Sequence, residues 1–306
     1  MISVIINCHN CHEFLAEALE SVLQQSENDW EIIFWDNASE KPAEAFVKAY
    51  GDERIHYFYD QEFVALGEAR NRALQHARGE YLAFLDSDDY WRPEKLARQL
   101  ALFTDAPSVG LVYSDANIVY KGEITKQVFS RMTPPEGEVF GELLGSYFLV
   151  MSSVMIRRSA LDKLVVWFDP RFEIIEEYDL FLRISADWKF RCVSEVLVDW
   201  RWHEGSTTMQ KRRLISIEKR LLLKQLNNAY PVLMRQQCAA EKRVKGKILI
   251  SLALSQYNAG NPKQARRILN KSHSYTSKGI FVYCATFFSV RLIEFFYRKI
   301  KGNPLV

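Results

Sequence analysis

Through its first 115 residues the chain alternates short apolar runs with segments that have the periodicity of an amphipathic helix. The apolar runs, which read as buried strands, lie at 3–6, 31–35, 55–59, 81–85 and 109–114. The helical segments between them lie at 15–23, 42–50, 65–77 and from Pro93 onward. This alternation is typical of βαβ units, in which a mainly parallel sheet carries helices on both faces. An open α/β sheet is therefore predicted.

The pattern changes twice after residue 115. Over 116–205 it is mixed, with strands expected at 151–156 and 192–198, a helix at 177–186 and a hairpin turn at Lys121-Gly122. Beyond residue 205 the strand signals stop, and helices are expected at 214–228, 232–258, 262–272 and 280–300. We therefore expect an α/β domain over 1–205, with parts 1–115 and 116–205, and an all-helical region over 206–306.

The net charge of +2 conceals a sharp division between these regions. Residues 205–306 contain 20 Lys and Arg but only 3 Asp and Glu, which gives them a charge of +17 and leaves −15 on residues 1–204. The division indicates an acidic, metal-using part followed by a basic part that meets an anionic partner. The alternative is two solvated surfaces that neutralise each other.

Composition excludes several classes of protein. The chain is 48% hydrophobic and 25% charged, which is the range of soluble globular domains. The first ten residues carry no Lys or Arg, so we expect no signal peptide. The longest uncharged stretch, 248–262, is 15 residues long and is too short for a membrane span. Five cysteines are too few for a disulfide scaffold, and a cytoplasmic protein is expected.

The strongest chemical signal is a run of carboxylates directly after an apolar strand. Residues 81–85 lead into Asp86-Ser87-Asp88-Asp89. In an open α/β sheet, ligands bind beyond the carboxyl ends of the strands. A divalent cation would relieve the repulsion between adjacent carboxylates, and Mg²⁺ or Mn²⁺ prefers oxygen ligands. The alternative is an acidic turn that caps the next helix.

Two more polar side chains end neighbouring strands. Asp36 follows the strand at 31–35, and Asn7 ends the first strand, so both lie on the same rim. A carboxylate accepts hydrogen bonds from ring N–H groups and would suit a nucleobase, although an Asx-turn is the commoner use of such an Asp.

Four separated motifs occur along the first 90 residues, as SVIINCHN at 3–10, DNAS at 36–39, ARN at 69–71 and GEYLAFLDSDD at 79–89. In sequence and in order they resemble the nucleotide-sugar half of the family 2 glycosyltransferases. The resemblance covers about residues 2–205 and implies the GT-A fold, a nucleotide-binding sheet flanked by helices. Asn7 departs from the pattern, because many relatives have Pro at this position.

The resemblance implies a role for each matching residue on the donor side. Asp36 would hold the base of the donor nucleotide, usually uracil, and Arg70 would lie near the base or the diphosphate. Asp86 would face the ribose, and Asp88 would ligate the metal bound to the diphosphate. The remaining donor-binding candidates are Asn7, His9, Asn10, Ser87 and His203, the last in a segment that resembles a loop closing over the diphosphate.

The acceptor side contains a segment, 174–183, that resembles the family's Glu-Asp motif, whose Asp is the proposed catalytic base. Glu177 stands in the place of that Asp, and Glu176 is the fallback. An acceptor hydroxyl must lose its proton as it attacks the anomeric carbon, and a positioned carboxylate can take it. Asp179 and Arg183, four residues apart, are expected to form a structural pair.

Cys8-His9-Asn10-Cys11-His12 also has the form of half a structural zinc site. No second Cys pair follows, because Cys192, Cys238 and Cys284 stand alone. We therefore do not expect zinc.

The function predicted is that of an inverting glycosyltransferase that uses a nucleotide-sugar, best a UDP-sugar, and Mn²⁺ or Mg²⁺. Its acceptor would be a glycan or a lipid-linked glycan in cell-envelope polysaccharide assembly. One alternative is a nucleotidyltransferase, although 6–12 lacks a Gly-rich phosphate loop. Another is a non-catalytic binder of nucleotide-sugars or nucleic acid. The aromatic residues of the basic region gather in its last helix, unlike those of a strand-binding groove, so no nucleic acid is expected.

That last helix, 279–301, pairs a basic stripe with an aromatic one. One face carries Arg291, Glu294, Arg298 and Lys301, whereas another carries Phe288, Leu292, Phe295 and Phe296. Such a helix suits an anionic membrane surface and would hold the enzyme on the inner face of the plasma membrane. The alternative is that it packs on the catalytic domain or on a second subunit in a homodimer.

Overall fold

A computed structural model describes residues 1–203, 211 and 213–272. The chain forms two compact units, of which the first comprises 1–139 and 149–210 and the second comprises 140–148 and 211–306. Residues 140–148, which the sequence pattern placed in the 116–205 part, thus group with the C-terminal helices. The predicted helix at 280–300 and the stripes at 279–301 lie outside the described residues.

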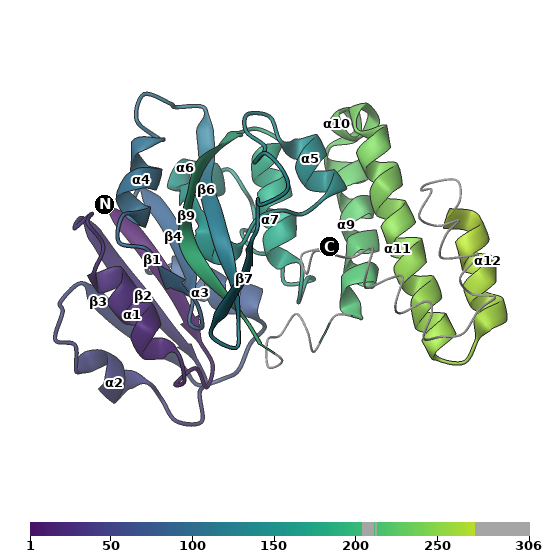
Figure 1. The fold of residues 1–306 in the computed structure, drawn as a ribbon. Coiled ribbons are helices and arrows are strands. Elements are labelled where there is room, and N and C mark those ends of the chain that lie inside the picture. The colour runs from purple at the N-terminus through teal and green to yellow at the C-terminus, as the bar shows by residue number, and fades with distance from the viewer. Residues whose placement is uncertain (204–210, 212, 273–306) are drawn as a thin grey trace. The chain divides into compact units, whose positions relative to one another are not determined.

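Four parallel strands make up the first half of the sheet in unit 1 (Figure 1). They are β1 (Ile2–Cys8), β2 (Trp30–Asn37), β3 (Ile55–Asp60) and β4 (Tyr81–Asp86), in the spatial order β3-β2-β1-β4. All five predicted apolar runs are strands in the structure. Since β1 and β2 are buried almost throughout, they form the centre of the core.

The second half of the sheet is mixed, so the parallel arrangement predicted from the first 115 residues does not continue through it. β8 (Val154–Arg157) is antiparallel to both of its neighbours, β4 and β6 (Val109–Tyr120). β6 pairs with β9 (Lys189–Trp202) in parallel, and the short strands β5 (Tyr90–Trp91) and β7 (Glu123–Gln127) are antiparallel additions.

Three strands of this half differ from their predicted extents, and one of them, β9, is longer at both ends than the predicted 192–198. β6 continues six residues beyond 114 because its buried polar side chains find partners in the core; Asn117, for example, donates to Asp199 over 2.6 Å. The run at 151–156 begins as a short 3₁₀ helix, η1 (Met151–Ser153), before β8. The predicted hairpin turn joins β6 to β7, with positive φ at Lys121 and Gly122.

Helices flank this sheet (Figure 1). They are α1 (Leu15–Leu23), α2 (Glu44–Lys48), α3 (Leu66–Leu74), α4 (Lys95–Ala101), α6 (Arg158–Asp162) and α7 (Glu176–Ser185). α1 buries Leu15, Leu19 and Val22, the spacing that predicted it. The first turn of α7 carries three carboxylates, where the partial positive charge of a helix N-terminus favours them.

The second unit is helical. It consists of α5 (Phe140–Gly145), α9 (Leu214–Ala229), α10 (Pro231–Gln236), α11 (Cys238–Asn258) and α12 (Pro262–Ser272). The single helix expected at 232–258 is divided at Gln237, which leaves the helical conformation. α11 and α12 share a small core of Ile250, Ala253, Ala265 and Leu269.

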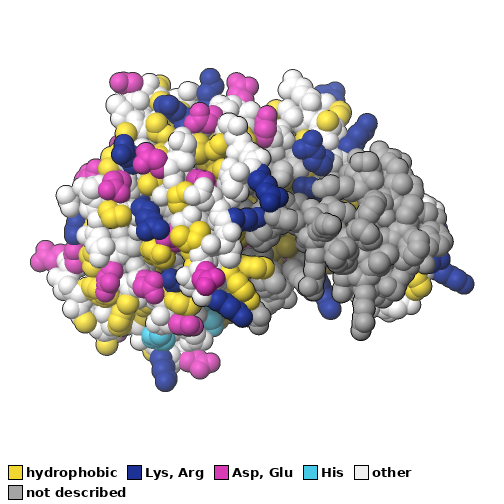
Figure 2. Space-filling model, viewed as in Figure 1, with side chains coloured by type: hydrophobic (Ala, Val, Ile, Leu, Met, Phe, Trp, Pro, Cys, Tyr) yellow, Lys and Arg dark blue, Asp and Glu magenta, His cyan; other side chains and the backbone are white. Residues whose placement is uncertain are grey.

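Charge is distributed unevenly over the visible face. In Figure 2, Asp and Glu side chains gather on unit 1, whereas the described part of the helical unit shows mainly Lys and Arg. Among the described residues, no helix combines the length and the apolar character that a membrane span requires.

Candidate active site

The polar residues predicted to share a rim lie at the carboxyl ends of adjacent strands. In the sheet register Asn7 of β1 pairs with Asp86 of β4, and Cys8 pairs with Asp36 of β2. Strand order alone thus brings three of the predicted donor-binding residues together. Asn7 Nδ2 is buried, and within the described part of the chain it has no hydrogen-bond partner. A buried donor without a partner is costly, so this atom is suited to a ligand oxygen.

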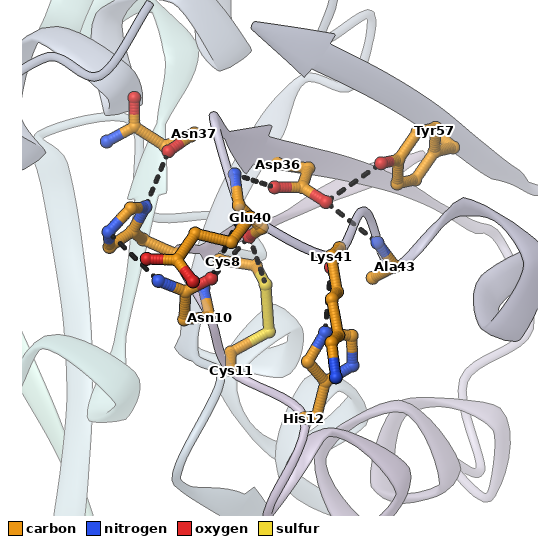
Figure 3. The surroundings of a disulfide bond; sticks show 12 residues. Cys8, Asn10, Cys11, His12, Asp36, Asn37, Glu40, Lys41, Ala43 and Tyr57 are labelled. Atoms are coloured by element: carbon orange, nitrogen blue, oxygen red, sulfur yellow. Dashed lines mark hydrogen bonds between the residues drawn. A yellow bond between two sulfur atoms is a disulfide. The ribbon is translucent and has the colours of Figure 1, made fainter.

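A disulfide joins Cys8 to Cys11 at the end of β1 (Figure 3). Sequence analysis did not predict this bond. Since a disulfide sulfur is not a thiolate ligand, the pairing removes the basis for zinc at this motif. Among the described residues no group of three or more His, Cys, Asp or Glu side chains is arranged to hold a metal ion by itself.

The loop closed by this disulfide is tied to the loop that follows β2 (Figure 3). His9 Nδ1 lies 2.8 Å from the carbonyl oxygen of Asn37. The backbone N–H of Asn10 donates to Ser39 Oγ over 2.9 Å, and its side-chain oxygen accepts from the N–H of Glu40 over 2.9 Å. His9 and Asn10 are themselves exposed. The two loops therefore present their exposed groups as one surface.

Asp36 has a different environment from the one that a direct base ligand requires. Its side chain is fully buried, and both oxygens are occupied. Oδ1 accepts from the N–H of Ser39, whereas Oδ2 accepts from the N–H of Ala43 and from the Tyr57 hydroxyl (Figure 3). The carboxylate shapes the loop from inside, as in the Asx-turn alternative.

The three carboxylates after β4 separate into two environments. Asp86 and Asp88 are 36% and 33% exposed at the side chain, and both are accessible from solvent. Asp89 is fully buried, accepts from the Ser152 hydroxyl and from the N–H of Arg201, and thereby ties β4 to η1 and β9. Two of the three thus face outward.

His203 lies beside the outer carboxylate of this pair. Its Nε2 is 2.9 Å from Asp88 Oδ2. Burial and the neighbouring Asp86 raise the pKa of Asp88, whereas His203 opposes this shift. A hard cation commonly binds one or two protein carboxylates and completes its shell with substrate phosphates and water. Asp86 and Asp88 fit that pattern.

Arg70 of α3 joins the strand rim to the start of α7. Its guanidinium is 2% exposed and donates to Asp86 and to Glu176, each over 2.9 Å. Glu177 Oε2 lies 3.8 Å from the same group. One buried cation therefore holds carboxylates from two elements that are 90 residues apart in the sequence.

The two glutamates of α7 differ in access. The side chain of Glu176 is 4% exposed, whereas that of Glu177 is 22% exposed. Burial raises the pKa of Glu176 to about 8, Arg70 opposes this shift, and Glu177 adds to it. Of the two, Glu177 is the one that solvent can reach.

Comparison with known proteins identifies the family. The model of "Glycosyl transferase family 2" matches residues 3–165. The chain is a family 2 glycosyltransferase. That assignment decides against the nucleotidyltransferase alternative.

Curated relatives agree with the assignment. A glycosyltransferase of Methanocaldococcus jannaschii is 31% identical over 211 residues, which cover 66% of this chain and 70% of the relative. The Escherichia coli enzyme WfaP, named as UDP-Glc:alpha-D-GlcNAc-diphosphoundecaprenol beta-1,3-glucosyltransferase, is 32% identical over 212 residues, 69% of this chain and 81% of its own.

Solved structures show the same fold. S. aureus TarS 1-349 with UDP-GlcNAc aligns with a TM-score of 0.59 at 19% identity and covers 97% of this chain and 91% of its own. The mannosyltransferase PcManGT of Pyrobaculum calidifontis, with GDP-Man and Mn²⁺, aligns with a TM-score of 0.60 at 16% identity, covering 99% and 87%. The glycosyltransferase therefore has the GT-A type fold.

Two residues that shape the site of this glycosyltransferase were not singled out from sequence. Ser152 accepts from the N–H of Asp86 over 3.1 Å and donates to Asp89, so it holds both ends of the acidic turn. Phe168 packs its ring 5.5 Å from the Arg70 guanidinium. Neither has a local signal, because each acts through a partner that is remote in sequence.

Proposed function

We propose that this glycosyltransferase is an inverting, metal-dependent enzyme that transfers a sugar from a nucleotide-sugar, best a UDP-sugar, to a glycan or lipid-linked acceptor in cell-envelope polysaccharide assembly. The names of its relatives support the donor and the acceptor. WfaP takes UDP-Glc and a diphosphoundecaprenol-linked acceptor, and TuaG of Bacillus subtilis, 41% identical over 102 residues, is named for teichuronic acid biosynthesis.

The observation that carries the proposal is the pair of carboxylate groups joined by Arg70. Asp86 and Asp88 lie on the strand rim where a donor would bind, and Glu176 and Glu177 begin α7. Arg70 contacts Asp86, Glu176 and Glu177, so its position fixes the distance between the donor side and the acceptor side. Fixed geometry of this kind is what a single displacement requires.

On the donor side the chain offers groups for each part of a nucleotide. Asn7 Nδ2, buried without a partner among the described residues, and the exposed His9 and Asn10 would bind the nucleoside. Asp36 would act indirectly by holding the loop after β2 in shape. Ser87 and Asp86 would face the ribose.

Asp88, with Asp86, would hold Mn²⁺ or Mg²⁺ next to the donor diphosphate. When bound, the cation offsets the negative charge that develops on the departing diphosphate. His203, 2.9 Å from Asp88, would orient that carboxylate and touch the diphosphate when the donor is present.

Glu177 would act as the general base. Its carboxylate is partly exposed and can meet an acceptor hydroxyl, whose proton it would take while the hydroxyl oxygen attacks the anomeric carbon. The bond to the diphosphate breaks on the opposite side, and the anomeric configuration inverts. Buried Glu176 would position Arg70.

The basic helical region would meet an anionic surface and hold the enzyme at the inner face of the plasma membrane. Between 213 and 272 the only acidic residues are Glu218, which is buried, and Glu241, which pairs with Lys245. Each basic residue near an anionic membrane contributes on the order of 1 kcal/mol. Packing of this region in a homodimer is the alternative.

The experiment that tests the proposal is a screen of UDP- and GDP-sugars for hydrolysis, with and without Mn²⁺, on wild type and Asp88→Asn. We expect Mn²⁺-dependent release of nucleotide from one UDP-sugar by the wild type. Asp88→Asn should lose at least about 10²-fold of that rate, because one charge-compensating ligand is removed. Full activity of Asp88→Asn, or of the wild type in excess EDTA, would refute the metal assignment.

A further inference from the structure

The loop that joins α6 to α7 in unit 1 carries exposed apolar side chains. Five consecutive apolar residues, Leu164 to Phe168, follow Lys163 in this loop, and the last of them is buried. Val165 is fully exposed and Val166 is 43% exposed. Single exposed apolar side chains are ordinary, but a contiguous apolar tip on a loop marks an interaction surface.

The loop is held firmly at its base. Arg183 donates to the carbonyl oxygens of Val166 and Trp167. On the same side, Arg183 is paired with the fully buried Asp179 over 2.7 Å. The Asp179–Arg183 pair, which the sequence predicted to be structural, therefore anchors the backbone of this tip and holds the exposed valines in place.

A second anchor ties the loop to the active site. Asn71 accepts from the N–H of Phe168 over 2.9 Å and donates to its carbonyl oxygen over 2.8 Å. Asn71 follows Arg70 on α3, and the Phe168 ring packs against the Arg70 guanidinium. Phe168, whose ring contacts the Arg70 guanidinium, thus directly follows the apolar tip. The same guanidinium contacts Glu176 and Glu177.

We propose that the tip at 164–167 inserts into the interface of the membrane that holds a lipid-linked acceptor. The inference rests on the lipid-linked acceptor of the proposed function. Valine and leucine side chains gain from leaving water at the boundary of the acyl chains, whereas Trp167 and Lys163 are suited to the head-group level. The contacts from Phe168 to Asn71 and Arg70 would then connect the inserted tip to the part of the site that contains Glu177.

A bilayer fits this surface better than a protein partner does. The exposed part of the tip is two adjacent valines, and it follows the exposed pair Asp162 and Lys163, whose ammonium lies 4.7 Å from the Trp188 ring. A stable protein interface needs a broad area of about 800 Å² per partner, whereas membrane insertion needs only a few protruding apolar side chains.

The test is sedimentation of the full chain with vesicles of equal parts phosphatidylglycerol and phosphatidylethanolamine in 0.5 M NaCl. High salt shortens the Debye length to a few ångströms and weakens binding by exposed basic residues, so apolar insertion remains. The variant Val165→Ser/Val166→Ser should reduce the fraction bound about tenfold, and Val165→Trp should increase it. Ile124→Ser, at a 58% exposed position on β7, is the matched control and should bind as wild type does.

Two results would overturn the proposal. One is a wild-type chain that does not bind these vesicles in high salt, and the other is equal binding by wild type and the double valine variant. Mn²⁺-dependent hydrolysis of the UDP-sugar, measured without vesicles, should be unchanged in all of these variants. A wild type that hydrolyses the UDP-sugar but does not bind the vesicles would therefore refute this inference alone, whereas absence of hydrolysis in the wild type would refute the proposed function.

Discussion

At the scale of single residues, the site is organised by one buried guanidinium and the carboxylates around it. Arg70 contacts Asp86 and Glu176 at 2.9 Å and has Glu177 at 3.8 Å. Three negative groups around one positive group leave excess negative charge in a region with little water. Burial and Glu177 accordingly favour the neutral form of Glu176, and its pKa rises to about 8 from a usual value of 4.5.

This pKa predicts how stability depends on pH. Between pH 4.5 and 8 the folded protein binds a proton at Glu176 that the unfolded chain has released, so the contribution is full below pH 4.5 and is lost as pH rises through 8. Glu176→Gln cannot titrate. The free energy of unfolding of wild type, relative to this variant, should therefore fall from pH 5 to pH 8, by up to about 1.4 kcal/mol per pH unit.

Urea denaturation at pH 5, 6, 7 and 8 measures this difference. Glu13→Gln, a substitution at an exposed position, controls for the effect of the exchange itself. A difference between wild type and Glu176→Gln that stays constant from pH 5 to 8 would show that Glu176 is ionised throughout.

At the scale of elements, the acidic turn after β4 depends on η1. Ser152 accepts from the N–H of Asp86 and donates to Asp89, and Asp89 in turn accepts from the N–H of Arg201 in β9. The turn that carries Asp88 is thus fixed from two sides. Buried Asp89 thus holds the turn that presents the accessible carboxylates of Asp86 and Asp88.

Ser152→Ala should destabilise the protein by about 1–3 kcal/mol, because it leaves a buried carboxylate oxygen of Asp89 without that donor. It should also weaken donor binding, since the acidic turn loses one of its two anchors. Urea denaturation and calorimetric titration with UDP and Mn²⁺ measure the two effects. Ser130→Ala, which removes an exposed hydroxyl bonded to Gln127, is the control. Equal stability of the two variants would show that Ser152 does not hold the turn.

The elements of the first half of the sheet were predictable because each is a local pattern. The strand at 81–85 is apolar without interruption and differs from β4 by one residue. β6 was predicted six residues too short, because the partner that satisfies Asn117 is Asp199, 82 residues away. Helix ends were less accurate, as at α2, where residues 42–50 contain a helix only over 44–48.

The candidate site was predictable in its residues and less so in their contacts. The βαβ pattern predicted that Asn7 and Asp86 lie on the same rim of the sheet, and the register of β1 and β4 pairs them. The internal bonds of Asp36 and the link from Arg70 to Glu176 were not predictable, because they depend on how separate elements pack. The Cys8–Cys11 bond was missed because spacing alone does not distinguish a disulfide from half a metal site.

At the scale of the whole molecule, the candidate site and the excess of basic residues lie in different parts of the chain. Unit 1 contains every described residue assigned to donor binding or catalysis, whereas the region after 205 carries a charge of +17. We expect the basic region to set where the enzyme works and unit 1 to set what it does. The apolar tip at 164–167 belongs to unit 1 and would let the catalytic unit itself contact the membrane.

The most direct test of the central claim is the hydrolysis rate of Glu177→Gln and Glu176→Gln beside wild type, with donor affinity measured on the same samples by calorimetry. Glu177→Gln should bind the UDP-sugar and Mn²⁺ within about twofold of wild type and lose about 10²-fold or more in kcat, as expected for removal of a general base. Glu176→Gln should lose less in kcat, because it leaves the base in place. An active Glu177→Gln beside an inactive Glu176→Gln would contradict the account and place the base one residue earlier.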